Sequence, residues 1–499
     1  MEPGFDLKKE LLRGLPAYTE GRMSDFVYDA GEGIAAGLDD GRILRSELNL
    51  GNEEFEKYME QLVLSGYAVT ERKAERRQVT VALSKGKTKV SAVKEGTAVL
   101  VRALDAEEEK PEKPVLVRTV TQTTAESFEA YLRLLESIGC KRIWQNRIED
   151  NLYRELLWEN HLIYAYFMGK TGTARFADDR VSARIDEFGG GSPLPGNKTA
   201  LCQFGLHYGR MVPGVSADCG MFYIIRLPDN SVFLIDGGEY EQATEAAVSE
   251  VMRVMCLLTG MPDGAKIRIA GWFCTHAHDD HLDLFGKLLR FHHDKLEVER
   301  VIFNFPSREN YDNMLQAYVV LDRLKRYYPH VRYLKPHSGQ SFLLAGVTFE
   351  FLQTHEDSTG PLGNELIGGF NDTCTILKIS FDGVSFMVLG DMDLSSEALI
   401  LRHYSEKTLR STAVQAAHHL INVLEFAYPA VAPKLALVPQ NISFGVPKDK
   451  RYKVLCRSVA EKNIYFASLG TDVFEEKNGE LMLTAHYPPV GGEYDGSET

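Results

Sequence analysis

The sequence has few cysteines, and none of them form a recognisable pair. The seven cysteines of the 499-residue chain are scattered, and no two are separated by just two residues. An odd number of dispersed thiols does not make a disulfide framework, and the spacing excludes paired-cysteine zinc and redox motifs. We therefore expect a protein of a reducing compartment.

The features that direct a chain into a membrane are also missing. The start, Met1 to Asp6, lacks the basic-then-apolar layout of a secretory signal peptide. No apolar run reaches the roughly 18 residues that a membrane-spanning helix needs. We expect a cytoplasmic protein with no membrane partner.

A positive net charge is absent as well. Lys and Arg number 56 against 70 Asp and Glu, which gives a formal net charge of −14. Dedicated nucleic-acid binders usually carry a basic footprint, so a nucleic-acid partner stays open but is not favoured. The content of hydrophobic residues, 44%, is ordinary for a globular protein, and the length allows two to four domains.

The first 195 residues contain a weak internal repeat. The same offset of 73 positions separates Phe55 from Phe128, Tyr58 from Tyr131 and Gly66 from Gly139. Each copy places apolar residues at helical spacing, ends them with the glycine, and continues with alternating segments typical of strands. We expect residues 1–195 to form an α+β domain of two αβββ units. A coincidence between two amphipathic helices is the alternative.

The remaining chain has a different pattern. Residues 187–200 are rich in Gly, Pro, Ser and Asn and indicate a linker. From 200 to 485, strand pairs alternate with helices, which predicts a layered α/β sandwich. Residues 486–499 are polar and rich in glycine, so we expect a disordered tail.

One short segment concentrates the residues that bind metals. His276-Ala277-His278-Asp279-Asp280-His281 directly follows the apolar run from Ile269 to Cys274 and precedes an apolar helical face. Imidazole and carboxylate are the usual ligands of hydrolytic zinc, and this many within six residues can surround one pocket. A solvated histidine-rich loop is the alternative, but its place after a buried strand favours a metal site.

This segment resembles the HxHxDH signature of the metallo-β-lactamase superfamily. Three further segments resemble motifs of that superfamily and come in the required order. Asp236, in Asp-Gly-Gly, resembles its first acidic motif, and Asp391 resembles its bridging aspartate. The pair His418-His419 resembles its final histidine. The closest pattern is that of the hydrolase domain of DNA-uptake competence proteins, which also has an Asn, here Asn371, before a strand.

The resemblance implies a fold and a set of metal ligands. The fold would be an αββα four-layer metallo-β-lactamase sandwich over residues 200–485, binding two divalent ions, zinc ahead of manganese or iron. The expected metal ligands are His276, His278, Asp280, His281, Asp391 and His418, with Asp391 between the two ions. Asp236 would orient a ligand histidine, and Asn371 and His419 would line the site or contact substrate.

Two ligand positions stay open. His418 and His419 compete for one of them, and we expect His418 because it directly follows the predicted strand Ala413 to Ala417. The first ion takes either His355 or no residue as its third ligand.

The implied activity is that of a metal-dependent hydrolase. A hydroxide held by two metal ions would attack the substrate, and Asp280 would be the catalytic residue. The expected substrate is a small molecule with a phosphoester or phosphodiester bond. Val446 stands where the competence-type domain often has a histidine, which weakens the case for a nuclease. Hydrolysis of a carboxylic ester, thioester, lactone or lactam is the alternative, as is a non-enzymatic partner-binding protein with a vestigial site. We expect the N-terminal region to shape the mouth of the site.

Overall fold

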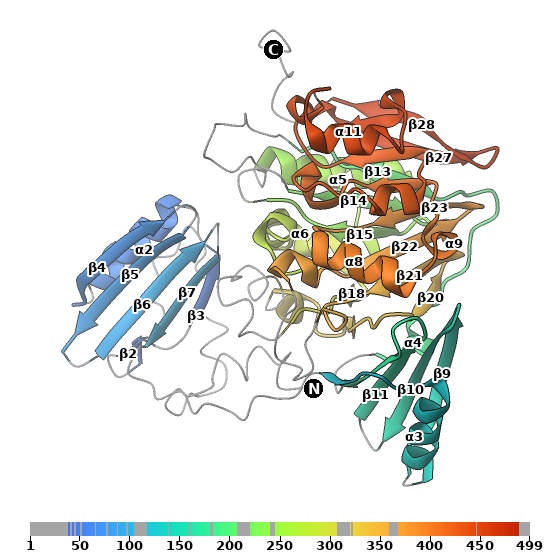
Figure 1. Ribbon diagram of the computed structural model, residues 1–499. Helices are drawn as coiled ribbons and strands as arrows, with labels where there is room; N and C mark the ends of the chain where they lie inside the picture. The colour runs from blue at the N-terminus through green and yellow to red at the C-terminus, as the bar shows by residue number, and fades with distance from the viewer. Residues whose placement is uncertain are drawn as a thin grey trace.

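The computed structural model describes the chain between residues 38 and 488, apart from 104–116, 207–219, 240–244, 307–319, 359–367 and shorter gaps. The expected tail, 486–499, falls almost entirely outside the described residues. A short strand pair, β1 (Leu38–Asp39) and β2 (Arg42–Ile43), comes first. Two α+β units and a large sandwich follow (Figure 1).

The two α+β units repeat one another element by element. The first consists of β3 (Ser46–Asn49), α2 (Asn52–Leu64), β4 (Ala68–Glu75), β5 (Gln78–Lys85), β6 (Thr88–Glu95) and β7 (Ala98–Ala103). The second consists of β8 (Val117–Val120), α3 (Ala125–Ser137), β9 (Lys141–Ile148), β10 (Asn151–Trp158), β11 (His161–Met168) and β12 (Thr173–Asp179). The sheet orders, β3-β7-β6-β5-β4 and β8-β12-β11-β10-β9, correspond strand for strand.

The offset of 73 residues relates four of these element pairs at both ends: α2 and α3, β4 and β9, β5 and β10, and β6 and β11. Each unit has one strand before its helix and four after it, so the expected αβββ order was too short. The two glycines of the repeat, Gly66 and Gly139, have φ values of +94° and +113°. Glycine takes these angles without the steric cost of a Cβ, which explains why both helices end there.

Residues 200–487 confirm the expected αββα four-layer sandwich. The nine-stranded sheet has the order β19-β18-β16-β15-β14-β13-β27-β28, with β17 paired to β16. Its strands are β13 (Ala200–Gln203), β14 (Phe222–Arg226), β15 (Val232–Asp236), β16 (Ile267–Phe273), β17 (Leu296–Val298), β18 (Arg300–Ile302), β19 (Arg332–Leu334), β27 (Thr471–Lys477) and β28 (Glu480–Tyr487). The seven-stranded sheet runs β20 (Ser341–Leu344), β21 (Val347–Gln353), β22 (Ile376–Phe381), β23 (Val384–Val388), β24 (Ala413–Gln415), β25 (Leu435–Val438) and β26 (Ile464–Phe466).

The two sheets pack face to face through apolar side chains. Phe233 of the first sheet and Phe349 of the second are fully buried, with ring centroids 4.2 Å apart. Phe273 and Phe351 make a second such pair at 6.0 Å. Because both faces of the sheet are covered at its centre, β16 is almost entirely buried, as the continuous apolar run before His276 indicated.

Helices cover the outer faces of the sandwich. In the described chain, α5 (Glu245–Thr259) and α6 (Asp283–His292) lie on the nine-stranded sheet. The helices α8 (Leu394–His403), α9 (Glu406–Leu409), α10 (Ala427–Val431) and α11 (Lys450–Cys456) belong to the layer on the seven-stranded sheet (Figure 1).

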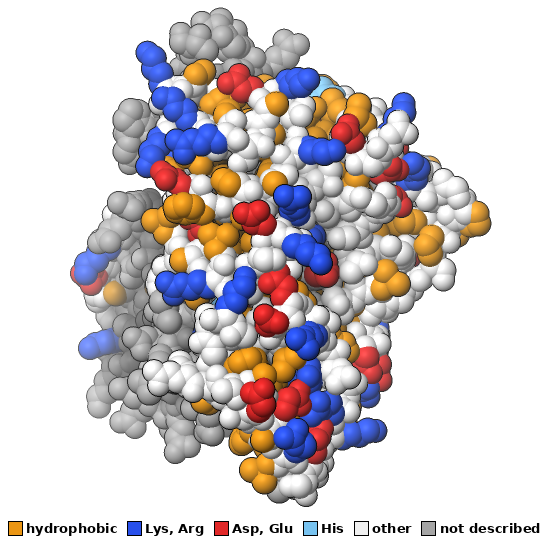
Figure 2. Space-filling model, turned by 45° about the vertical axis from the view of Figure 1, so that its right-hand side comes forward, with side chains coloured by type: hydrophobic (Ala, Val, Ile, Leu, Met, Phe, Trp, Pro, Cys, Tyr) orange, Lys and Arg blue, Asp and Glu red, His pale blue; other side chains and the backbone are white. Residues whose placement is uncertain are grey.

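The surface carries charges of both signs. On the face drawn in Figure 2, Lys and Arg side chains are interspersed with Asp and Glu, with apolar side chains between them. No helix among the described residues is long and apolar enough to cross a membrane.

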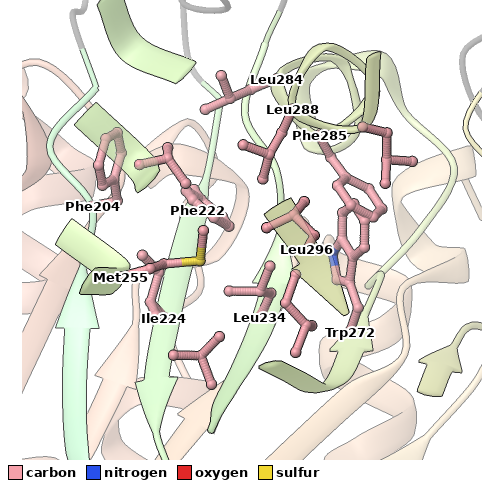
Figure 3. Close-up of a cluster of buried hydrophobic side chains, with 14 of the residues drawn as sticks. Phe204, Phe222, Ile224, Leu234, Met255, Trp272, Leu284, Phe285, Leu288 and Leu296 are labelled. Atoms are coloured by element: carbon pink, nitrogen blue, oxygen red, sulfur yellow. The ribbon is translucent and has the colours of Figure 1, made fainter. Parts of the chain in front are cut away.

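The packing of α6 fixes the loop that precedes it. Leu284, Phe285 and Leu288 are buried in the same apolar cluster as Leu234 and Trp272 of the sheet (Figure 3). Full burial of each such side chain contributes roughly 1.5–3 kcal/mol. The histidine-rich segment between β16 and α6 is therefore held between two well-packed elements.

The second α+β unit docks on the sandwich through tyrosines. Tyr153, Tyr164 and Tyr166 are fully buried on the sheet face opposite α3. The Tyr153 hydroxyl lies 2.9 Å from that of Tyr404, Tyr164 donates to the Ser338 carbonyl, and Tyr166 donates to Asp357. The expected linker is packed here too: Phe188, in α4 (Ile185–Phe188), is fully buried, and Gly190 bridges to Leu344.

Candidate metal centre

The predicted metal-binding segment lies at the end of β16, where the chain leaves the sheet. The side chains of His276 and His278 approach Asp391, which follows β23 in the other sheet. One ligand atom from each of the three residues falls within 4.8 Å of the others. His276 Nε2 lies 3.8 Å from Asp391 Oδ2 and 2.9 Å from His278 Nδ1. These three residues form the first cradle.

A second cradle shares Asp391 with the first. Its other members are Asp280, His281 and His419, and all four side chains are buried. His281 Nε2 lies 3.1 Å from Asp391 Oδ1 and 3.2 Å from His419 Nε2. His419 Nε2 lies 3.5 Å from Asp280 Oδ2. The two nitrogens and two carboxylates converge on one point, as ligands of a single ion do.

The carboxylate of Asp236 sits behind the second cradle. It is fully buried and accepts hydrogen bonds from the backbone N–H of Thr275 at 2.7 Å and from its hydroxyl at 2.8 Å. Its Oδ2 lies 2.6 Å from His281 Nδ1. A proton on Nδ1 leaves the lone pair of Nε2 directed into the cradle, which is the contact that the orienting role expected for Asp236 requires.

The electrostatics of the two cradles suit a cation. Burial disfavours the charge on Asp391, but His419 and His281 outweigh it and hold the pKa of Asp391 well below its usual range. Burial likewise lowers the pKa of His419, but Asp391 and Asp280 outweigh it and raise that pKa to about 9. In the absence of metal, protons balance the buried carboxylates. A divalent ion can take their place because neutral imidazole and ionised carboxylate are its normal ligands.

The expectation for the histidine pair was wrong: His419, not His418, belongs to the second cradle. Strand β24 ends at Gln415, so His418 does not directly follow it. His418, His419 and Leu420 then adopt left-handed φ values of 47°, 49° and 58°. This turn buries His419 and leaves 20% of the His418 side chain exposed.

His418 instead lies beside the cradles between two amides. Its Nδ1 is 2.7 Å from Asn422 Nδ2, and its Nε2 is 3.1 Å from the amide of Asn371. Its Nε2 is 3.8 Å from Asp391 Oδ2. Asn371 lies in the short helical turn Phe370–Thr373. A role for it in lining the site or contacting substrate stays a prediction.

His355 belongs to neither cradle. It is buried after β21, where its Nε2 lies 2.8 Å from Asn304 Oδ1. Burial is the main reason that its pKa falls to about 3, so the ring stays neutral. Of the two alternatives for the first ion, the geometry favours the one without His355.

Sequence reasoning missed two residues that contact the ligands. Thr275 immediately precedes the motif, and its hydroxyl links Asp236 to His276 Nδ1 at 3.1 Å. The ring of Phe370 lies over that of His278 with centroids 4.7 Å apart. The position of Thr275 beside the motif was an available signal, whereas nothing in the sequence pairs Phe370 with His278.

The four layers, with a ligand at the end of β16 and another after β23, complete the pattern. The fold is of the metallo-β-lactamase type. No protein-family model matches the sequence, and a search of curated proteins found no similar one.

Three solved structures match parts of the chain at low similarity. CmlA, a diiron β-hydroxylase from Streptomyces venezuelae, is 13% identical with a TM-score of 0.29, over 55% of this chain and 53% of that one. The short form of human tRNase Z is 10% identical with a TM-score of 0.28, over 58% and 99%. A mutant flavo di-iron protein from Thermotoga maritima is 16% identical with a TM-score of 0.21, over 53% and 48%. The match covers about half the length of CmlA. The type of fold follows from the strand order and the four layers, and not from these matches.

Proposed function

We propose that the chain is a hydrolase of the metallo-β-lactamase superfamily that works with two divalent metal ions. The observation that carries the proposal is the place of Asp391, whose two oxygens face the two cradles. A carboxylate between two sites of nitrogen and oxygen ligands is suited to a pair of ions with a shared substrate oxygen. The ligand set accommodates zinc, manganese or iron, and we place zinc first.

The residues of the site have separable tasks in this proposal. His276, His278 and Asp391 would hold one ion, and Asp280, His281, His419 and Asp391 the other. When bound, such a pair polarises a substrate oxygen and activates water near neutral pH. Asp236 keeps a proton on Nδ1 of His281. The Pro439 carbonyl, 3.2 Å from Nδ1 of His419, keeps a proton on the same nitrogen of that ring. With the Nδ1 protons so held, Nε2 of each ring is the nitrogen that would bind an ion.

We further propose that the substrate is a small phosphoester or phosphodiester. The intact set of carboxylate and histidine ligands and the resemblance to competence-type hydrolase domains support it. The net charge of −14 favours a small substrate over a nucleic-acid polymer.

The test combines metal content with a substrate panel. Elemental analysis of the purified protein should find close to two metal ions per chain after loading with Zn²⁺ or Mn²⁺. Asp391→Asn should lose most of both ions, whereas Asp186→Asn, at an exposed distant carboxylate, should keep them. The loaded protein would then be offered a phosphodiester, a phosphomonoester, a thioester and a lactone. Turnover of the phosphoesters that depends on Asp391 supports the proposal, and turnover of the thioester or lactone alone contradicts its substrate class.

A further inference from the structure

Three large apolar side chains are exposed beside the metal centre. Leu394 is 61% exposed, Phe426 65% and Ile421 37%. Leu394 comes three positions after Asp391, and Ile421 two positions after His419. A single exposed apolar residue is normal, but several gathered next to a polar cluster mark a binding site. We call these three residues the apolar rim.

The side chain of Glu397 joins the segment before α10 to the start of α8. The N–H groups of Phe426 and Ala427 donate to Glu397 Oε1 at 3.0 and 2.7 Å. Glu397 lies in the first turn of α8, which begins at Leu394, so Phe426 sits against that turn. The segment from Ile421 to Phe426 therefore runs from the histidine turn to the start of α8.

The loop that carries Asn371 reaches the same place. Asp372 Oδ1 accepts a hydrogen bond of 2.8 Å from the backbone N–H of Ser396, also in the first turn of α8. This contact brings Phe370 and Asn371 to the start of α8. Phe370 covers His278 of the first cradle, so this loop also presents an apolar side chain at the metal centre.

His418 lies where the apolar rim meets the metal centre. Asn371 Oδ1 is buried and has no hydrogen-bond partner, while its Nδ2 faces His418 Nε2. A rotation of the Asn371 side-chain amide by 180° exchanges the positions of its oxygen and nitrogen. Oδ1 then faces Nε2 of His418 and can accept a hydrogen bond from it. Asn422 then donates to Nδ1. With both nitrogens so engaged, the ring of His418 is fixed in orientation at the edge of the site.

The backbone at His418 supports a functional reading of this arrangement. Three consecutive non-glycine residues, 418 to 420, have left-handed φ values, and each costs on the order of 1 kcal/mol. Strain of this kind persists where it places side chains for function. Here it sets His419 in the second cradle and His418 beside the apolar rim.

We propose that the metal centre takes an amphiphilic ester, with its polar group at the ions and its hydrocarbon group on the apolar rim. His418, held by Asn371 and Asn422, lies between the ions and the apolar rim. The inference rests on the proposed hydrolase function and narrows its substrate class. A hydrocarbon chain is the matching occupant because Leu394, Ile421 and Phe426 are apolar and exposed, and the first two lie within three positions of Asp391 and His419 in the chain.

The first experiment compares two p-nitrophenyl phosphodiesters whose second alcohol is methanol or octanol. The zinc-loaded protein should prefer the octyl ester in kcat/KM, mainly through a lower KM. Leu394→Ser and Phe426→Ser should each reduce that preference on the order of tenfold, the effect of about two buried methylene groups. Leu134→Ser is the control, since Leu134 is 56% exposed on α3 of the second α+β unit. An unchanged preference in both rim variants, or an equal loss in the control, overturns the proposal.

The second experiment does not depend on hydrolysis. Octylphosphonate and methylphosphonate cannot be hydrolysed as esters, and calorimetry measures their binding to the zinc-loaded full chain. Octylphosphonate should bind more tightly, and the rim variants should reduce the difference. His418→Gln changes no residue of the apolar rim and should leave the difference between the two affinities intact. If the chain-length effect appears while no ester is hydrolysed, the proposed function fails and the apolar rim stands. Equal affinities for the two phosphonates overturn the apolar rim itself.

Discussion

Asp236 Oδ2 lies 2.6 Å from Nδ1 of His281, and both side chains are fully buried. The contact joins the end of β15 to the histidine-rich loop after β16. It also fixes which nitrogen of His281 carries a proton, so that the other faces Asp391 3.1 Å away. A carboxylate behind a ligand histidine raises the basicity of that ligand as well as orienting it.

Replacement of this carboxylate should weaken metal binding without removing a ligand. We expect Asp236→Asn to lower the Zn²⁺ affinity of the second cradle by about 10–100-fold, the usual effect of losing such a partner. Competition with a chromophoric chelator measures the affinity. Asp186→Asn, at an exposed carboxylate of α4, is the matched control. An affinity for Zn²⁺ equal to that of the unchanged protein would show that Asp236 does not orient His281.

The two adjacent histidines should differ sharply in metal content. His419→Ala removes a nitrogen of the second cradle, so we expect close to one ion per chain. His418→Ala leaves both cradles complete and should retain close to two. The variants differ by a single position in the chain, so each is the control for the other. Loss of an ion in His418→Ala together with full occupancy in His419→Ala would reverse the assignment.

The sequence was sufficient to predict the fold and the location of the cluster, because both depend on local patterns. The HxHxDH segment follows a buried strand, and the offset of 73 residues gave the repeat. The identity of the second histidine was out of reach. It depends on the left-handed turn at 418–420. Residues other than glycine adopt this conformation only when tertiary packing imposes it, and here Leu420 is fully buried.

The docking of the second α+β unit was also beyond sequence reasoning. Tyr153, Tyr164 and Tyr166 alternate along their strands and fit an ordinary half-exposed sheet face. Only the structure shows that Ser338, Asp357 and Tyr404 meet their hydroxyl groups. These contacts bring the unit to the loop after β21. That the N-terminal region shapes the mouth of the site stays a prediction.

Metal binding should release protons at neutral pH. Asp391 and Asp280 raise the pKa of His419 to about 9 in the metal-free site, despite its burial, so this ring is protonated at pH 7.5. An incoming ion must displace that proton, so the affinity for Zn²⁺ should rise with pH between 7.5 and about 9. Asp391 keeps its charge throughout, because its pKa lies well below the usual range. Calorimetry in buffers of different ionisation enthalpy measures the protons released, and a count of zero at pH 7.5 contradicts the prediction.

Acid should destabilise the contact between the second α+β unit and the sandwich. His403 is buried at this contact: its carbonyl accepts from Asn151 Nδ2, and its Nδ1 lies 3.9 Å from Asp357 Oδ1. Burial is the main cause that lowers the pKa of His403 to about 4, whereas an unfolded chain titrates near 6.5. The folded protein therefore binds fewer protons between these values, and stability is lost as the pH falls from 6.5 toward 4.

Acid also removes a stabilising contribution of Glu356, which precedes Asp357 in the chain. This carboxylate therefore does not offset the loss of stability caused by His403. Burial disfavours the charge on Glu356, but His337 and Lys335 outweigh it and lower its pKa to about 2, below the ordinary 4.5. Its stabilising contribution is present above pH 4.5 and is lost as the pH falls toward 2.

For His403 alone, a shift of the pKa from 6.5 to about 4 corresponds to roughly 2 kcal/mol of stability lost between pH 7.5 and pH 5. We expect the midpoint of thermal unfolding to fall over that interval in the full chain, and to fall less in His403→Asn, which cannot take up the proton. An equal decrease in both proteins would show that His403 is not the group that titrates.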